Sequence, residues 1–332
     1  MSVTKLPVTK MSVKKMSVAL AAASTLVLAG CSSTGQEEDS GGGDELDLTI
    51  AVITHSGPGD TFWEVVKSGA DQAGSDLGVT VDYNADADPV RQSELIDNAV
   101  SQDVGGIVVS MANPDGVRDS VQAAVQAGIP VVTINSGLEQ SAEFGAITHV
   151  GQSESIAGAA VGQRLNEEGA QGKVLCVIHE AGNIGLEDRC SSVGETYDGG
   201  VENLQVDGTN VADVEDTILS KLQSDPDVGV ILTLGGQFGI AAADAQAEAG
   251  TDALIGTFDV SEDVLNRIVD GDILFAVDQQ PYVQGYLGVQ LLYLKVLNGN
   301  DVGGGQPVLS GPAFVDASNA EAVLEFATDG TR

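Results

Sequence analysis

The stretches VQAAVQAGIPVVTIN (121–135) and AADAQAEAGTDALIGTFD (242–259) share one plan, and this repeat decides the fold. Each is an alanine-rich helical pattern that stops at Ala-Gly, continues as a short apolar strand and ends on one polar residue, Asn135 or Asp259. Near-continuous apolar strands that alternate with helices are typical of parallel sheets covered on both faces. The sequence therefore predicts two similar α/β lobes in tandem.

The pattern extends along most of the chain. In the first half we expect strands over 48–55, 79–83, 106–110 and 130–134, and helices over 62–77, 90–101 and 115–127. In the second half we expect strands over 173–179, 204–206, 228–234, 254–258, 274–277 and 313–315, and helices over 186–203, 211–224, 238–249 and 282–297. Ligands bind at the carboxyl ends of strands in such sheets, so two facing lobes predict a cleft. The late strand and helix indicate that the chain returns to the first lobe, and several such crossings make a hinge.

The first 31 residues have the pattern of an export signal. Four lysines and no acid precede a short apolar run, which ends in LAGC (28–31). This order is typical of a secretory signal, and the run falls short of the roughly 20 apolar residues of a membrane span. A cysteine after Leu-Ala-Gly resembles the bacterial lipobox, which implies that Cys31 is lipidated and anchors the protein to the outer face of the cell membrane. An ordinary signal with a chance cysteine is the alternative.

Composition restricts the partners of the exported part. The segment SSTGQEEDSGGGDE after Cys31 is polar and predicts a flexible tether up to residue 46. Residues 1–30 hold four of the 14 basic residues and none of the 49 acidic ones, which leaves 10 against 49. Such a surface repels phosphate backbones, which argues against nucleic-acid binding. The acids are scattered without ligand-like spacing, so we predict no metal. The surface is either an ordinary solvated one or an adaptation to high salt.

Two cysteines remain once Cys31 is assigned to lipid. Cys176 and Cys190 stand fourteen positions apart in the second lobe. In an exported protein such a pair predicts a disulfide. Two buried free thiols are the alternative.

A family resemblance covers about residues 46–316. Its carriers are DTFWEVVKSGAD (60–71), GGIVVSMANPD (105–115), AGIPVVTINS (127–136), HVGQSESIAG (149–158), GTFD (256–259) and AVDQQPYVQGYLG (276–288). In this order they resemble the ribose-binding-protein-like, type I substrate-binding proteins of sugar ABC transporters. The resemblance implies two Rossmann-like lobes, 47–152 with 280–310 and 153–279 with 311–327, joined by three segments. It also implies a monomer that uses no cofactor and delivers a sugar or polyol to a permease.

The resemblance places candidate ligand contacts in the first lobe. Phe62 and Trp63 match the family's sugar-stacking aromatic pair, although both also fit a helix core. Asp60 and Ser110, with Met111 beside it, match positions that often contact hydroxyls. His55 and Ser56, at the end of the first strand, are either site or loop residues. Asn135 and Ser136 stand where the family often has Asp-Arg, so the ribose ligand itself does not carry over.

Further candidates come from the second lobe. Arg189 matches an arginine whose planar fork suits vicinal hydroxyls, with a structural salt bridge as its alternative role. Asp259 matches a carboxylate that accepts hydroxyl hydrogen bonds, and Gln279 matches a hinge-side amide. Gly235 replaces a frequent asparagine, for which Gln237 can substitute. The loop residues Glu180 and Asn183 are weaker candidates.

Two other functions compete with transport. A dinucleotide-dependent enzyme would use the glycine-rich turn GGQFG (235–239), but its spacing departs from G-x-G-x-x-G and no basic residue lies near it. We therefore expect no catalysis. An extracellular sensor that presents the sugar to a membrane receptor would keep the same fold, and the sequence does not separate it from a transport protein.

Overall fold

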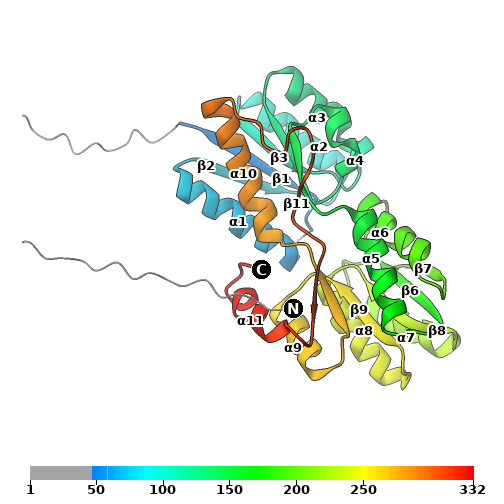
Figure 1. Cartoon of the computed structure of the whole chain (residues 1–332). Coiled ribbons are helices and arrows are strands. Elements are labelled where there is room, and N and C mark those ends of the chain that lie inside the picture. Colours follow the sequence, from blue (N-terminus) through cyan, green and yellow to red (C-terminus); the bar gives the residue numbers. More distant parts are fainter. Residues whose placement is uncertain (1–46, 58) are drawn as a thin grey trace, which may run out of the picture. The chain divides into compact units, whose positions relative to one another are not determined.

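The structure is a computed structural model that describes residues 47–57 and 59–332. The predicted signal peptide (1–30), the predicted lipidation site Cys31 and the predicted tether (31–46) lie outside the described residues. Figure 1 shows two α/β lobes, each built on one six-stranded sheet with helices on both faces. The two-lobed α/β prediction is confirmed.

The first sheet has the strand order β11-β5-β4-β3-β1-β2, all parallel. Alternate residues of each strand point to opposite faces, so the lobe has two cores. Ile50 and Val108 pack with α1 and α10 on one face, while Ile53 and Ile107 pack with α2 and α3 on the other. The bounds are β1 (Thr49–Thr54), α1 (Thr61–Leu77), β2 (Thr80–Ala85), α2 (Pro89–Ser101), β3 (Gly106–Ser110), α3 (Pro114–Gln126), β4 (Val131–Ile134), α4 (Leu138–Phe144), β5 (Thr148–Gly151), α10 (Pro281–Asn298) and β11 (Val308–Leu309).

The second sheet has the order β12-β10-β9-β8-β6-β7 and repeats the plan of the first. Its edge strand β12 runs antiparallel to β10, which corrects the expectation of purely parallel sheets. The antiparallel direction follows from topology, because β12 enters this lobe directly from β11 without a crossover helix. The bounds are α5 (Glu154–Glu167), β6 (Lys173–Ile178), α6 (Ile184–Thr196), β7 (Val201–Gln205), α7 (Val211–Ser224), β8 (Val228–Thr233), α8 (Gly236–Ala249), β9 (Leu254–Phe258), α9 (Glu262–Asp270), β10 (Phe275–Asp278), β12 (Ala313–Asp316) and α11 (Ala320–Thr328).

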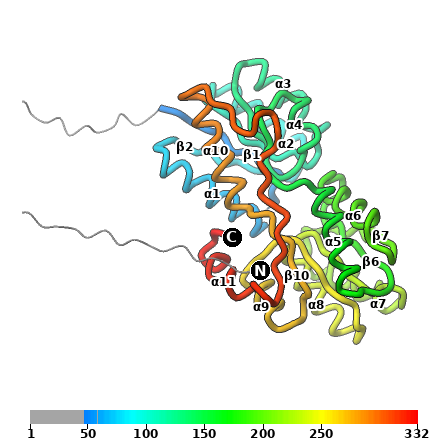
Figure 2. The backbone as a smooth tube through the Cα atoms, in the orientation of Figure 1, coloured from blue at the N-terminus to red at the C-terminus, as the bar shows by residue number. Residues whose placement is uncertain are grey.

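The chain passes between the two sheets three times. The first passage joins β5 to α5, the second joins β10 to α10 and the third joins β11 to β12. The tube in Figure 2 shows the second and third passages running side by side near the middle of the molecule. After the first two passages, the arriving helix packs on a helix of the lobe that it enters: α5 packs on α6, which follows β6, and α10 packs on α1, which follows β1.

Glycines make both helix contacts close. A side chain at Gly285 would collide with the carbonyl of Val66 on α1, and one at Gly158 would collide with the carbonyl of Arg189 on α6. The backbones therefore approach as near as glycine allows. The second contact fixes α6, the helix that carries Arg189.

The predicted helix over 186–203 is wrong in its second half. Helix α6 ends at Thr196, and β7 begins at Val201. The turn between them contains Gly200 with a φ of 83°, a left-handed conformation that interrupts a helix. The prediction also left out α4, β5, α5, α9, β11 and α11, several of which are short.

Cys176 on β6 and Cys190 on α6 are joined by a disulfide, as predicted. Both cysteines are buried, and their Cα atoms are 5.9 Å apart. The bond attaches α6 to β6, the strand next to the edge strand β7 of its sheet. Among the described residues, no helix combines the length and apolarity that a membrane crossing requires.

Candidate ligand-binding cleft

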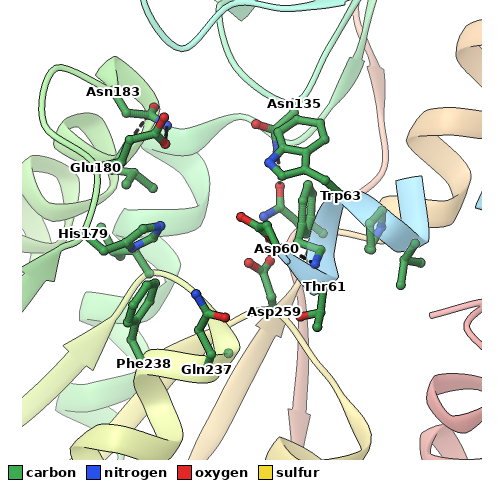
Figure 3. Close-up of a pocket in the computed structure, with 18 of the residues that line it drawn as sticks. Asp60, Thr61, Trp63, Asn135, His179, Glu180, Asn183, Gln237, Phe238 and Asp259 are labelled. Atoms are coloured by element: carbon green, nitrogen blue, oxygen red, sulfur yellow. Dashed lines mark hydrogen bonds between the residues drawn. The ribbon is translucent and has the colours of Figure 1, made fainter. Parts of the chain in front are cut away.

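A pocket lies at the carboxyl ends of the strands of both sheets, and both lobes contribute to it (Figure 3). Its volume is about 720 Å³ when the open mouth is included. The position is the one that parallel sheets predict. Its lining consists of His55, Asp60–Trp63, Val65, Asn135, Ser136, His179, Glu180, Asn183, Leu186, Arg189, Leu234–Phe238, Asp259–Ser261, Gln279 and Pro281.

The structure brings most of the predicted contacts together in this cleft. The nine that line it are Asp60, Phe62, Trp63, Asn135, Ser136, Arg189, Gln237, Asp259 and Gln279. Ser110 and Met111 do not line it, because both are completely buried at the end of β3. The Ser110 hydroxyl is instead hydrogen-bonded to His55, which does line the cleft.

The repeat that decides the fold also positions two polar side chains. Asn135 follows β4 and Asp259 follows β9, and both have a left-handed φ, 61° and 68°. Gln279, in the second passage between the lobes, joins them. Its Oε1 accepts a hydrogen bond from Asn135 Nδ2 at 3.1 Å, and its Nε2 donates to Asp259 Oδ1 at 2.6 Å. A hinge-side amide therefore connects equivalent strand ends of the two lobes.

Two carboxylates of the cleft have raised pKa values. Asp60 caps helix α1 and accepts a hydrogen bond from the Phe62 backbone N–H at 3.0 Å. Burial raises the pKa of Asp60 to about 6, an effect that this hydrogen bond opposes. Burial likewise raises the pKa of Asp259 to about 7, although the charge of Arg189 and the bond from Gln279 oppose the increase. Both side chains therefore titrate near neutral pH.

Arg189 lines the cleft, but its guanidinium fork is engaged. Its Nε lies 2.5 Å from Glu154 Oε2 and its Nη2 lies 2.9 Å from Glu154 Oε1, a bidentate pair in which both side chains are buried. The guanidinium also lies 4.6 Å from the centre of the Phe258 ring. Glu154 begins α5, directly after the first passage between the lobes. The salt-bridge role that we considered for Arg189 is thus present, and few of its donors face the cleft.

Aromatic rings lie on both sides of the cleft. In the first lobe Trp63 makes edge contacts with Phe62 and His55 at ring-centre distances of 5.0 and 4.7 Å. Trp63 is only 5 % exposed and belongs to the core of the first lobe, and its side chain also lines the cleft. In the second lobe His179 stacks on Phe238 at 4.3 Å. Figure 3 shows this pair across the cleft from Trp63 and Asp60.

Sequence reasoning missed His179 and Phe238, although a signal for the histidine was present. His55 and His179 follow β1 and β6, equivalent strands of the two lobes. Gly235 leaves room for the stacked pair, because a Cβ there would lie 3.2 Å from Phe238 and 3.4 Å from His179. The chain therefore has Gly235 at the position where the resemblance predicts an asparagine, and the stacked rings of His179 and Phe238 form this wall of the cleft instead.

The cleft contains no free cation among the described residues. All ten lysines and arginines of the described part form ion pairs with carboxylates. Only Arg189 among them lines the cleft, and Glu154 neutralises it. Asp60, Glu180 and Asp259 line the cleft without such a partner. In the described residues no group of side chains has the arrangement of a metal site.

Comparison with known proteins identifies the family. The profile of a family described as periplasmic binding protein domain matches residues 50–301, and the chain therefore belongs to this family. It is a member of the sugar-binding class of ABC-transporter binding proteins, an extracytoplasmic class, as the motifs predicted.

Individual relatives agree with this assignment. A solved carbohydrate transporter from Acidothermus cellulolyticus, in complex with myo-inositol, is 43% identical with a TM-score of 0.84, over 86% of this chain and 100% of that one. The ribose import binding protein RbsB of Bacillus subtilis is 25% identical over 87% of this chain and 94% of its own. The xylose/arabinose-binding protein XylF of Sulfolobus acidocaldarius is 29% identical over 60% of this chain, which spans 54% of that relative.

Proposed function

We propose that this protein captures an uncharged polyol of monosaccharide size, with myo-inositol as the first candidate, and delivers it to an ABC importer. The observation that carries the proposal is a cleft with three carboxylates and no free cation among the described residues. Carboxylate oxygens accept hydrogen bonds from hydroxyl groups, and the charge strengthens them. The same carboxylates repel phosphate and carboxylate groups.

The geometry of the cleft supports a proposed role for each wall. Asp60 Oδ1 and Asp259 Oδ1 accept hydrogen bonds from the protein, which leaves the other oxygen of each carboxylate for hydroxyls of the ligand. Trp63 and Phe238, on opposite walls, would pack against the C–H surfaces of the polyol ring. Gln237 and Asn135 would contribute amide hydrogen bonds.

A cyclitol fits this set better than a pyranose does. A pyranose has a ring oxygen that only accepts hydrogen bonds, and such an oxygen needs a donor from the protein. The planar donors of Arg189 are largely occupied by Glu154. A carbocyclic polyol with a hydroxyl on each carbon offers a donor at every position. The relative solved with myo-inositol, 43% identical to this chain, supports the same choice.

Transport by hinge closure extends the proposal. The moving units would be 47–152 with 280–310 and 153–279 with 311–327, each of which supplies part of the cleft. A ligand that contacts both units stabilises the closed arrangement only while it is bound. Lipid attachment at Cys31 would hold this monomer beside its permease. The mechanism requires binding and release without any chemical change, so the protein would not be an enzyme.

The test is a ligand screen by thermal shift, followed by calorimetry. We expect one molecule of myo-inositol per chain and a rise in Tm, because a ligand that binds only the folded state stabilises it. Ribose, xylose, arabinose and fructose serve as neutral alternatives, and inositol phosphate and glucuronate as anionic controls that should not bind. The proposal would be refuted if no polyol raised the Tm of the protein while a nicotinamide dinucleotide did.

A further inference from the structure

His55 and Ser110 form a buried hydrogen-bonded unit at the wall of the cleft. His55 directly follows β1, is 6 % exposed and lines the cleft. Ser110 is the last residue of β3 and is completely buried. The Ser110 Oγ atom lies 2.7 Å from His55 Nδ1 and 3.0 Å from the backbone nitrogen of His55.

The hydrogen-bonding capacity of a hydroxyl decides which ring nitrogen carries the proton. Ser110 Oγ accepts a hydrogen bond from the backbone N–H of His55. If it also accepted one from Nδ1–H, its own proton would have no acceptor among the described groups, and an unsatisfied buried donor is costly. If the hydroxyl donates to Nδ1, both the hydroxyl and Nδ1 are satisfied, and Nε2–H is left for a partner in the cleft. Burial lowers the pKa of His55, so the ring is neutral at pH 7 and its proton lies on Nε2.

The Nε2 atom is directed toward the second lobe. Glu180 Oε2, across the cleft, lies 3.9 Å from it, beyond hydrogen-bonding distance. The edge contact with Trp63 at 4.7 Å helps to fix the plane of the ring. We infer that Ser110 is a positioning residue that holds His55 in the Nε2–H tautomer, and that His55 thereby donates a hydrogen bond to an oxygen of the bound polyol. The inference rests on the proposed function and adds a donor to a cleft dominated by acceptors.

The second lobe contains a natural comparison. Strand register pairs Ile53 with Val109 and Val177 with Thr233, so Leu234 occupies the position equivalent to Ser110. His179, the counterpart of His55, accordingly has no hydroxyl partner, and its Nδ1 makes no hydrogen bond within the described residues. Of the two histidines that line the cleft, only His55 therefore has this tautomer lock, which would orient the ligand relative to the first lobe.

Nitrogen-15 NMR of the imidazole rings tests the tautomer directly in the ligand-free protein. The chain has only three histidines, so each signal can be assigned by substitution. We expect the Nε2–H pattern for His55 in the wild type and in S110T, which keeps the hydroxyl, and a tautomer mixture in S110A. A wild-type spectrum with the proton on Nδ1 would overturn the inference.

Calorimetry with myo-inositol tests the role in binding through a double-mutant cycle. We expect S110A to weaken binding about fivefold to tenfold, the usual effect of one hydrogen bond. In an H55Q background, where no imidazole remains to be positioned, S110A should change affinity less than about twofold. S120A, which removes another buried hydroxyl of the first lobe (hydrogen-bonded to Ser93), is the matched control and should have no effect.

The outcomes separate this inference from the function on which it rests. An equal loss of affinity from S110A in both backgrounds would show a merely structural role for Ser110 and would overturn the inference, while binding of the polyol by the wild type would leave the function intact. Failure of the wild type to bind any polyol in the screen would overturn the proposed function, and with it the ligand contact of His55.

Discussion

Replacing Asp259 by asparagine should stabilise the ligand-free protein at alkaline pH and weaken ligand binding. Asparagine keeps the shape of the side chain and an oxygen that can accept the hydrogen bond from Gln279. It removes the negative charge, which is destabilised by burial in the cleft. Asp259→Asn therefore separates the cost of holding a carboxylate in the cleft from the role of that carboxylate in binding.

The magnitude follows from the pKa. Burial raises the pKa of Asp259 from 3.8 to about 7. Between these values the folded state holds a proton that the unfolded state releases, so the contribution of this group to stability falls as pH rises from about 4 to about 7. At about 1.4 kcal/mol per pKa unit the full cost is at most about 4 kcal/mol. Because the cleft is open to water, we expect about 1–2 kcal/mol above pH 8.

Urea unfolding of both proteins between about pH 4.5 and 8.5 measures the difference. Asp259→Asn should be nearly neutral at the acid end and stabilising at the alkaline end. Its affinity for the ligand should fall at least about tenfold and keep only the pH dependence that Asp60 contributes. Asp252→Asn, at an exposed position of the same lobe, is the charge-matched control. A stability difference that stayed constant across the pH range would refute the reasoning, and unchanged affinity would remove Asp259 from the site.

Three further predictions concern stability. Glu154→Gln leaves the buried Arg189 without its bidentate partner and should cost about 3–5 kcal/mol in urea unfolding; a loss below about 1 kcal/mol would mean that water compensates the arginine. Replacing both Cys176 and Cys190 by alanine opens a loop with a sequence separation of 14 and should cost about 3 kcal/mol, whereas an unchanged midpoint would argue that the disulfide adds nothing. Molar potassium chloride should raise the free energy of unfolding, because it screens repulsion among 49 acids, and a flat salt dependence would exclude salt adaptation.

The fold was predictable where the pattern was local. The Ala-Gly stops at 127–128 and 249–250, each followed by an apolar strand, located Asn135 and Asp259 at equivalent strand ends. The segment from Gly137 to Gly151 was not predictable in this way. It contains the seven-residue helix α4 and the four-residue strand β5, which are too short to show periodicity. The antiparallel direction of β12 likewise depends on a passage between lobes and leaves no local signal.

The candidate site was predictable as a set of positions but not as a set of interactions. Matching motifs placed nine of eleven candidates on the cleft, but no sequence pattern showed that Arg189 would be paired with Glu154, 35 residues earlier. Ser110 illustrates the same limit. Its position next to the site followed from the motif, whereas its partner His55, 55 residues away, follows only from the pairing of β1 with β3.

Gln279 connects the passages between the two lobes to the candidate binding site. One amide accepts a hydrogen bond from Asn135 of the first lobe and donates to Asp259 of the second, while its backbone carbonyl accepts bonds from Ser310 in the third passage and from Gln284 on α10. A change in the angle between the lobes must therefore alter the partners of at least one of these groups. Asp259 is also a proposed ligand contact. A ligand hydroxyl and the amide of Gln279 would therefore both donate hydrogen bonds to the same carboxylate. Ligand binding and lobe movement are then coupled through one residue, without any long-range pathway.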